Sequence, residues 1–319
     1  MEKTLSGKII RRTSGNYEIM PDVSAKSEDC TSCTVFCRAK GAFRFEGQEP
    51  LVGDNILIKA LDGQNFVIDK ILPRKNSLIR PPIANLDFLF VMFAAKSPEP
   101  VLSTVDKLIS IAEYNKIEPV IIVTKSDIDF QAAQAYASIY RKSGFTVFSA
   151  GETESAAEIS DFINQNLTGK TAAFAGASGI GKSTLINRLF PDLSLETGEI
   201  SRKISRGKHT TRSVDLYTVK TASGAGFLAD TPGFGILDFE RFNFFTNDDL
   251  VYTFREFEPY IGKCRYTKCS HTKEENCAVI EAVRTGAIPK ERHESFVIMR
   301  GELKNKHEWD KKKTKPEGK

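Results

Sequence analysis

Residues 176–183, with the sequence GASGIGKS, fit the phosphate-binding pattern G-x-x-x-x-G-K-[ST]. Glycines at these positions let backbone N–H groups converge on phosphate oxygens, and the start of a helix adds positive potential. Lys182 is expected to bridge the β- and γ-phosphates, and Ser183 to bind Mg²⁺. A glycine-rich turn without a ligand would not require a Lys-Ser pair in register. The predicted phosphate-binding residues are Gly176, Ala177, Ser178, Gly179, Ile180, Gly181, Lys182, Ser183 and Thr184.

An acidic element, Asp230-Thr-Pro-Gly233, follows this loop and comes directly after the apolar run 227–229. A carboxylate at the end of a strand can reach the Mg²⁺ shell, so Asp230 is predicted to be a magnesium ligand. The backbone N–H of Gly233 can bind the γ-phosphate, and such a glycine moves when that phosphate leaves. A D-x-x-G element is common by itself, but downstream of a phosphate loop it indicates a nucleotide-dependent switch.

A base-reading element precedes the loop. Asp127 follows the apolar run 120–123, and its carboxylate can accept two hydrogen bonds from guanine that adenine cannot supply, which predicts selection of GTP over ATP. The stem of Lys125 can lie along the base, and Thr124 stands where asparagine is commoner. A Ser-Ala pair after another apolar run can present a backbone N–H to the guanine oxygen. The predicted base-binding residues are Thr124, Lys125, Ser126, Asp127, Ser149 and Ala150.

The basic segment 207–212 lies between the loop and the acidic element. A threonine hydroxyl there can complete Mg²⁺ coordination, and Thr211 is favoured over Thr210. The residue after the switch glycine is Phe234, whose ring cannot orient an attacking water. His209 is the nearest polar candidate for that task, although a contact with a partner or a cap of local structure is the alternative. Slow intrinsic hydrolysis is expected in either case. The predicted catalytic residues are His209, Lys182, Thr211 and Gly233, and the predicted magnesium ligands are Ser183, Thr211 and Asp230.

The six cysteines fall into two groups. The second group, with one histidine, has the spacing C-x4-C-x-H-x5-C and supplies three thiolates and one imidazole, a complete tetrahedral set for one structural Zn²⁺ per chain. Unconnected thiols are the alternative interpretation. The first group offers three ligands only, so free thiols are predicted there. The predicted zinc ligands are Cys264, Cys269, His271 and Cys277; the predicted free thiols are Cys30, Cys33 and Cys37.

The composition is that of a globular protein, with 40% hydrophobic and 27% charged residues in 319. The first eight residues lack the apolar core of a signal peptide, and no apolar run is long enough to span a membrane, which predicts a cytoplasmic protein without a membrane partner. The net charge of +4 is mild, but basic residues cluster in 202–212 and 304–319. A polyanionic partner is one interpretation of these clusters; a solvated tail is the other for the second.

Three domains are predicted: a barrel over 1–75, an α/β domain over 80–240, and a zinc-binding region with a basic tail over 241–319. Short strands separated by turns in the first favour an OB-type barrel, with an SH3-like barrel second. Such a barrel can bind RNA or serve structure alone. Buried parallel strands alternating with helices indicate a doubly wound sheet. Strands are expected at 7–12, 17–21, 35–45, 55–60, 65–72, 88–93, 120–123, 145–148, 171–175 and 227–229, and helices at 105–115, 131–142, 156–166, 183–190, 274–285 and 290–305.

The motifs TKSD, SA, GASGIGKST, GKHTTR and DTPGF, then the cysteine–histidine cluster, resemble in this order the circularly permuted GTPases of the RsgA (YjeQ/YloQ) type. The resemblance covers nearly the whole chain. It implies an OB barrel, a permuted P-loop GTPase and a mainly helical zinc domain. It also implies GTP hydrolysis stimulated by the small (30S) ribosomal subunit, binding to 16S rRNA, and release afterwards. In that family the histidine matched by His209 is the proposed water-positioning residue.

The leading hypothesis is therefore a GTP-hydrolysing factor, expected to be monomeric, in small-subunit maturation. An RNA-binding module whose nucleotide site gates affinity with negligible turnover is the alternative. A GTP-dependent enzyme acting on a small molecule ranks last, because no further acid, base or nucleophile constellation supports it.

Overall fold

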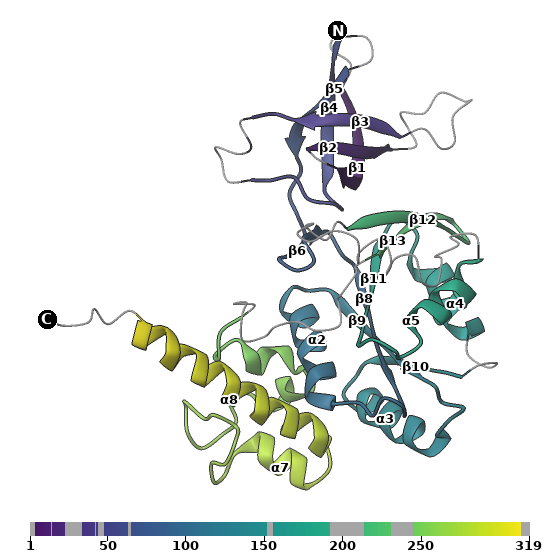
Figure 1. Ribbon diagram of the computed structural model, residues 1–319. Coiled ribbons are helices and arrows are strands. Elements are labelled where there is room, and N and C mark those ends of the chain that lie inside the picture. The colour runs from purple at the N-terminus through teal and green to yellow at the C-terminus, as the bar shows by residue number, and fades with distance from the viewer. Residues whose placement is uncertain are drawn as a thin grey trace, which may run out of the picture. The chain divides into compact units, whose positions relative to one another are not determined.

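The computed structural model describes residues 4–13, 15–22, 34–41, 43, 48–62, 65–151, 156–191, 214–230 and 245–313 (Figure 1). Contacts within the chain divide it into two compact units, which are described separately. Unit 1 comprises Met1–Phe88, Ile159–Phe174 and Ser183–Phe234; unit 2 comprises Leu89–Glu158, Ala175–Lys182 and Gly235–Lys319. The predicted domain boundaries stay predictions.

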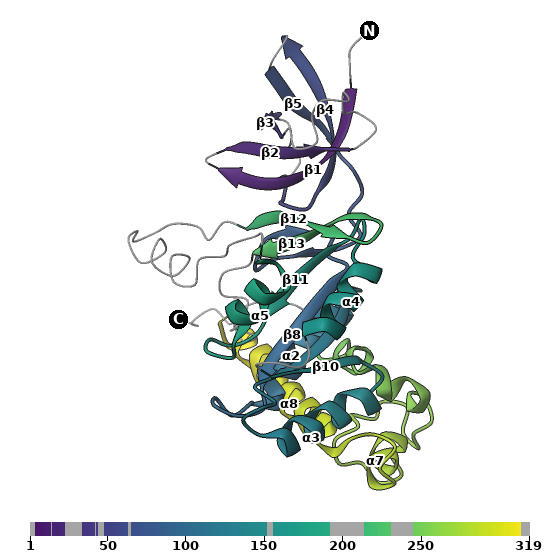
Figure 2. The same cartoon turned by 90° about the vertical axis from the view of Figure 1, so that its right-hand side faces the viewer.

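The N-terminal part of unit 1 is a closed five-stranded barrel (Figures 1 and 2). Its first strand pairs with both the second and the fourth, and the third and fifth pair in parallel, which closes the order β1-β2-β3-β5-β4. This pairing is OB-type, so the leading prediction is confirmed. The strands are β1 (Thr4–Thr13), β2 (Asn16–Pro21), β3 (Val35–Ala39), β4 (Asn55–Asp62) and β5 (Asn65–Ile71).

Alternation along the strands fills the barrel interior with β-branched side chains. Ile9, Ile19 and Ile58 are 0% exposed there. Gly7 is required where β1 crosses β2, because a Cβ on it would lie 2.7 Å from the carbonyl oxygen of Met20. The strand expected over 35–45 ends at Ala39, so the prediction is wrong at Lys40, Gly41 and Phe43, which lie outside any strand; residues 42, 44 and 45 lie outside the described residues.

Unit 1 also contains β11 (Thr171–Ala175), β12 (Asp215–Thr221) and β13 (Gly224–Asp230), with most of α4 (Ala156–Asn166) and α5 (Lys182–Leu189). β13 runs parallel to β11, as expected, whereas β12 forms an antiparallel hairpin with β13. No strand was predicted at β12, and its antiparallel pairing makes the sheet depart from the purely parallel one that was expected. A short hairpin of β6 (Ser77–Leu78) and β7 (Ile83–Ala84) follows the barrel.

Unit 2 begins with the strands β8 (Phe88–Ala94), β9 (Glu118–Thr124) and β10 (Thr146–Ala150), in the order β10-β9-β8. All seven residues of β8 are buried, as expected for a strand covered on both faces. The helices α2 (Leu102–Tyr114) and α3 (Phe130–Lys142) connect these strands. β9 and β10 pair in parallel, as predicted for the α/β domain.

The C-terminal part of unit 2 is helical, as predicted. It contains the 3₁₀ turns η3 (Leu250–Thr253) and η4 (Arg255–Tyr260), then α7 (Ala278–Arg284) and α8 (Lys290–Lys313). The helix expected from residue 274 begins later, because residues 264–277 form the loop that carries the cysteine–histidine cluster. Gly286, with a φ of 74°, ends α7.

A buried charge cluster joins α8 to the α/β part of unit 2. The guanidinium of Arg292, 0% exposed, donates to Asp106 of α2 at 2.5 Å and to Glu256 of η4 at 2.6 Å. Tyr140 of α3 donates to the same Asp106 oxygen at 3.1 Å. Burial alone would lower the pKa of Arg292. The two carboxylates outweigh burial and raise the pKa above its ordinary value, so the residue stays a cation.

Candidate nucleotide and metal sites

The phosphate loop leaves β11 and enters α5. Gly176 has a φ of 156°, and a Cβ there would lie 2.4 Å from both the Met92 carbonyl oxygen and the Ile180 side chain, so only glycine fits. Ile180, 2% exposed, anchors the loop in the core. The Lys182 ammonium donates to the Gly176 carbonyl at 3.3 Å, which holds the cation over the loop. Ser183 and Thr184 are exposed in the first turn of α5, where their hydroxyls are accessible to a ligand.

Thr124 ties the base-reading element to this loop. It ends β9, is 4% exposed, and its hydroxyl lies 2.6 Å from the Ile180 carbonyl oxygen and 3.2 Å from that of Phe93. A hydroxyl has one proton, and the shorter distance assigns it to Ile180. Segments 56 residues apart in the chain therefore meet within unit 2, with the base-reading element preceding the phosphate loop in sequence.

The rest of the base-reading element turns sharply after Thr124. Lys125 has a φ of 56°, and its ammonium donates to the Ser97 carbonyl. The Ser126 N–H donates to the Ala150 carbonyl at 3.3 Å, which brings the predicted Ser149-Ala150 pair beside it. Asp127 is exposed and therefore accessible to a base.

Two features of this region suit a polar ligand. The Ser149 hydroxyl oxygen is buried and has no hydrogen-bond partner among the described residues. Gly151 follows the Ser-Ala pair, and a Cβ on it would lie 3.1 Å from the Ser126 hydroxyl and 3.3 Å from an Asp127 carboxylate oxygen. Sequence reasoning did not single out Gly151, although a glycine directly after the Ser-Ala pair was a usable signal.

The remaining predicted nucleotide residues lie wholly or partly outside the described part of the chain. Asp230 ends β13, and its backbone alone is described. His209, Thr211 and Gly233 lie outside the described residues, as does Thr210. Their roles stay predictions.

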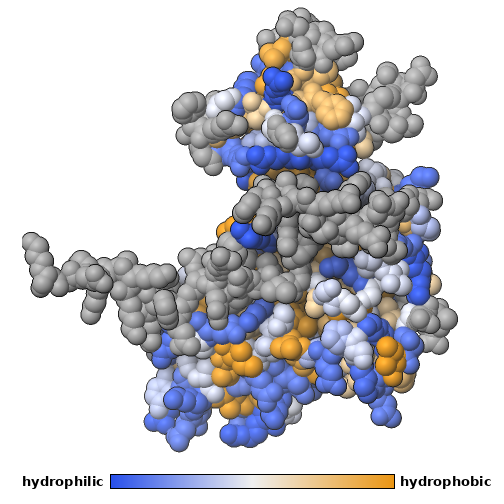
Figure 3. Space-filling model, in the orientation of Figure 1, coloured by the Kyte–Doolittle hydropathy of each residue, from blue (hydrophilic) through white to orange (hydrophobic). Residues whose placement is uncertain are grey.

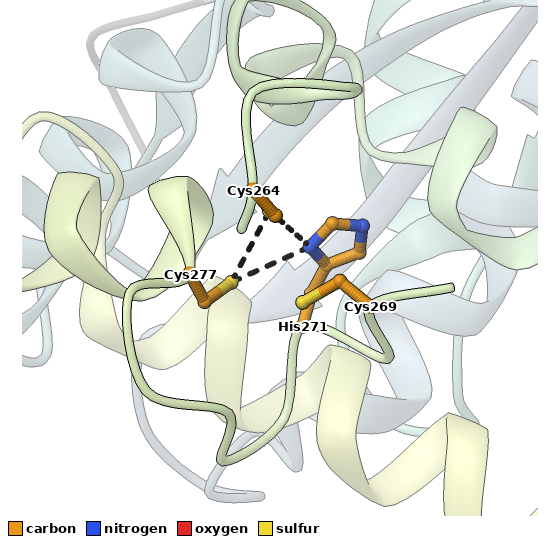
Figure 4. A group of neighbouring side chains, drawn as sticks. All are labelled: Cys264, Cys269, His271 and Cys277. Carbon is orange, nitrogen blue, oxygen red and sulfur yellow. Dashed lines mark hydrogen bonds between the residues drawn. The ribbon is translucent and has the colours of Figure 1, made fainter. Parts of the chain in front are cut away.

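The second site is the cysteine–histidine cluster of the C-terminal part (Figure 4). The four predicted ligand atoms lie within 4.8 Å of one another. His271 Nδ1 is 3.5 Å from the Cys264 sulfur and 3.4 Å from the Cys277 sulfur, and those two sulfurs are 3.7 Å apart. Zn–S bonds of about 2.3 Å in a tetrahedron place sulfurs about 3.7 Å apart, so the spacing fits zinc. Burial, then the neighbouring thiols, raises the pKa of Cys269 to about 12, which a bound dication would reverse.

Two residues outside the ligand set hold the metal loop, and no sequence pattern indicated either of them. Glu274 accepts the backbone N–H groups of Ser270 at 2.7 Å and Thr272 at 3.1 Å. Although burial opposes it, these hydrogen bonds lower the pKa of Glu274 to about 2. His293 of α8 donates to the His271 carbonyl at 2.7 Å. The loop is thus held by Glu274 from within and by His293 of α8 from outside.

Of the first cysteine group, only Cys37 lies within the described residues. It is a free thiol, 2% exposed in the barrel, and burial raises its pKa to about 11. Cys30 and Cys33 lie outside the described residues. Within the described part of the chain, the cysteine–histidine cluster is the one group with metal-ligand spacing.

Comparison with known proteins identifies the family. The model of the RsgA GTPase matches residues 71–240, and that of the RsgA N-terminal domain matches residues 6–68. A small ribosomal subunit biogenesis GTPase RsgA from Agathobacter rectalis is 38% identical over 96% of this chain and all of its own length. The chain belongs to the RsgA GTPase family. A relative with the same name from Bacillus subtilis strain 168 is 36% identical over 94% of this chain and 98% of its own.

Solved structures of the RsgA family agree with the fold. YloQ, described as a circularly permuted GTPase, is 32% identical with a TM-score of 0.74, covering 95% of this chain and 96% of its own. YjeQ from Thermotoga maritima is 28% identical with a TM-score of 0.75, covering 94% and 99%. The chain is accordingly a circularly permuted GTP hydrolase, which confirms the predicted enzyme class and fold.

Replacing Thr124 with valine, which has the same shape, is expected to weaken GDP and GTP binding about tenfold, because the Ile180 carbonyl loses its donor and the loop its tether. Titration of a fluorescent guanine nucleotide measures this. Thr124→Ser keeps the hydroxyl and should bind nearly as the parent protein does. Equal affinities for the valine and parent proteins would show that the tether has no part in binding.

Proposed function

We propose that this GTPase binds the small (30S) ribosomal subunit and its 16S rRNA late in maturation, hydrolyses GTP when the subunit stimulates it, and then dissociates. The observation that carries the proposal is the Thr124–Ile180 contact, which unites base-reading and phosphate elements in the permuted order of this family. Relatives that are named for small-subunit biogenesis and match almost end to end support the partner.

For hydrolysis we propose that Mg²⁺ binds with GTP through Ser183, Thr211 and Asp230. These hydroxyl and carboxylate oxygens are the hard ligands that Mg²⁺ prefers. Lys182 neutralises charge on the β- and γ-phosphates, and the Gly233 N–H binds the γ-phosphate. His209 orients the attacking water, since Phe234 occupies the position after the switch glycine. Phosphoryl transfer needs positioning and charge stabilisation above all, which this set supplies.

For RNA binding we propose the outer face of β3. Phe36 is 66% exposed at the second position of this strand, and the exposed Arg38 follows on the same face. An exposed aromatic ring beside a guanidinium suits base stacking and phosphate contact. On the side that Figure 3 shows, the described barrel surface mixes hydrophilic and hydrophobic residues.

We further propose that the protein acts as a cytoplasmic monomer, since the predicted nucleotide and metal residues all belong to one chain and ribosomal subunits are assembled in the cytoplasm. No helix in the described ranges is long and apolar enough to cross a membrane.

We propose that the cysteine–histidine cluster holds one structural Zn²⁺. Purified protein is expected to contain about one zinc per chain, because four protein ligands close a tetrahedral site. Cys269→Ser should lose this metal, measured by elemental analysis after dialysis against a weak chelator. Cys37→Ser, which changes a buried thiol in the barrel, is the matched control and should retain it. Retention of full zinc by Cys269→Ser would contradict the assignment.

The decisive experiment measures phosphate release with and without small ribosomal subunits, and subunit pull-down with GDP, GTP and a non-hydrolysable GTP analogue. Release should rise many-fold with subunits, and the analogue should retain more protein on the subunit than GDP does. Binding that ignores the nucleotide, or a rate that ignores the subunit, would overturn the proposal. Strong nucleotide-dependent binding without stimulated turnover would favour the nucleotide-gated RNA-binding alternative.

A further inference from the structure

A continuous register in unit 1 connects the barrel with the predicted magnesium ligand. Arg11 of β1 pairs with Asp215 of β12, and Asp215 pairs in turn with Asp230, the last residue of β13. The three positions therefore lie in one row across three strands. Asp215 is also four residues after Thr211, so β12 begins close in sequence to the predicted switch threonine.

Side chains reinforce this row. The Arg11 Nε lies 3.2 Å from Asp215 Oδ1, a buried oxygen that accepts no hydrogen bond from the described residues, so the guanidinium balances its charge. The same guanidinium reaches Glu18 of β2 at 3.3 Å, which holds it in place. One arginine thus links two barrel strands to β12.

A second contact lies beside the first. The Lys8 ammonium lies 5.5 Å from the centre of the Phe227 ring, and Phe227 precedes Asp230 by three residues on β13. Burial, followed by repulsion from Lys75, lowers the pKa of Lys8, which means that both disfavour its charged form. The π face of Phe227 offsets part of this cost, because it attracts the ammonium. β1 therefore contacts both strands of the hairpin that leads to the predicted magnesium ligand.

We propose that Arg11 and Asp215 are positioning residues that transmit RNA binding on the barrel to the magnesium end of β13, and so raise the rate of GTP hydrolysis. This inference rests on the proposed function, because it concerns stimulated turnover. β13 is also held by its pairing with β11, so unstimulated hydrolysis does not depend on the contact with β1. RNA bound to the barrel shifts β1, and the row from Arg11 to Asp230 carries that shift to the site.

The test compares Arg11→Met and Asp215→Asn with a matched control. Arg12→Met removes the next arginine on β1, which is similarly exposed (41% against 44%) but pairs with the exposed Glu49 rather than with β12. Both test variants should keep the unstimulated rate of GTP hydrolysis. Their stimulation by small ribosomal subunits should be about fivefold weaker than that of the parent protein, since couplings between sites are typically of this size or larger. Arg11→Lys retains the charge and should recover most of the stimulation, and Arg12→Met should keep all of it.

Hydrogen exchange in the isolated, GTP-loaded protein supplies a readout that needs no ribosome. Arg11→Met should speed exchange of the β12 and β13 amides, and Arg12→Met should not. Unchanged exchange and unchanged stimulation in Arg11→Met, or equal losses in Arg12→Met, would overturn the inference. If the parent protein showed no stimulation, the proposed function would fail, and exchange would then decide whether Arg11 positions the strands.

Discussion

Replacing Asp127 with asparagine is expected to weaken GTP binding by about 100- to 10,000-fold, because each of two hydrogen bonds to a carboxylate contributes about 1.5–3 kcal/mol. Asparagine keeps the shape but presents an amide N–H₂ group where guanine also presents a donor. Asp127 is exposed at the end of the β9 turn, beside Gly151, so nothing described blocks a base from reaching it. Equilibrium titration with labelled GTP measures the loss.

The same substitution predicts a change of specificity, which separates base recognition from damage to the fold. Xanthine carries an oxygen where guanine carries its exocyclic amino group, so the asparagine amide can donate to it. Asp127→Asn should therefore bind xanthosine triphosphate more tightly than GTP. Binding of GTP at parental affinity, or equal loss of both nucleotides, would refute the assignment of Asp127 as the base reader.

A matched control lies two residues away. Asp129 accepts the Ala132 N–H at 3.0 Å as the N-cap of α3 and pairs with Lys96 at 3.2 Å. The hydrogen bond from the Ala132 backbone N–H, followed by the one from the Lys96 side chain, lowers the pKa of Asp129. Asp129 is therefore a carboxylate at neutral pH. Asp129→Asn removes the same charge from the same loop. Its nucleotide selectivity should stay that of the parent protein.

The sequence predicted most elements of the fold because their patterns are local. β8 is a continuous apolar run and α3 begins at an aspartate N-cap, so both were found to within a few residues. β12 was missed because it shows only weak alternation, and its pairing with β13 depends on a turn at 222–223. The late start of α7 reflects the metal loop, which overrides a helical pattern.

The candidate site shows the same division. The phosphate loop and the base-reading element are motifs whose chemistry fixes residue types, so they can be read without a structure. The hydrogen bond from Thr124 to the Ile180 carbonyl could not be predicted from the sequence, because a backbone acceptor has no sequence signature. Nor could any pattern pair Arg292 with Asp106, since their contact depends on how α8 packs against α2, 186 residues away.

That packing leads to the second large effect. Arg292→Met is expected to destabilise unit 2 by about 3–5 kcal/mol, because Asp106 and Glu256 would remain buried without a counter-ion. Their side chains are 1% and 4% exposed, so water cannot take the place of the guanidinium. The ring of Phe254, 4.5 Å from the guanidinium carbon, adds a contact that methionine replaces only in part. Urea unfolding, monitored by the hydrogen exchange of α2 and α8, measures the change in the free energy of unfolding.

Two further variants test the cause. Arg284→Met removes an exposed arginine that pairs with Glu281 on α7, and should change stability by less than about 0.5 kcal/mol. Replacing all three charges, as Arg292→Met with Asp106→Leu and Glu256→Met, should recover much of the loss, because no uncompensated charge remains buried. If the triple variant were no more stable than Arg292→Met, the loss would come from packing rather than from stranded carboxylates. A single variant as stable as the parent protein would mean that the cluster does not hold α8 on α2.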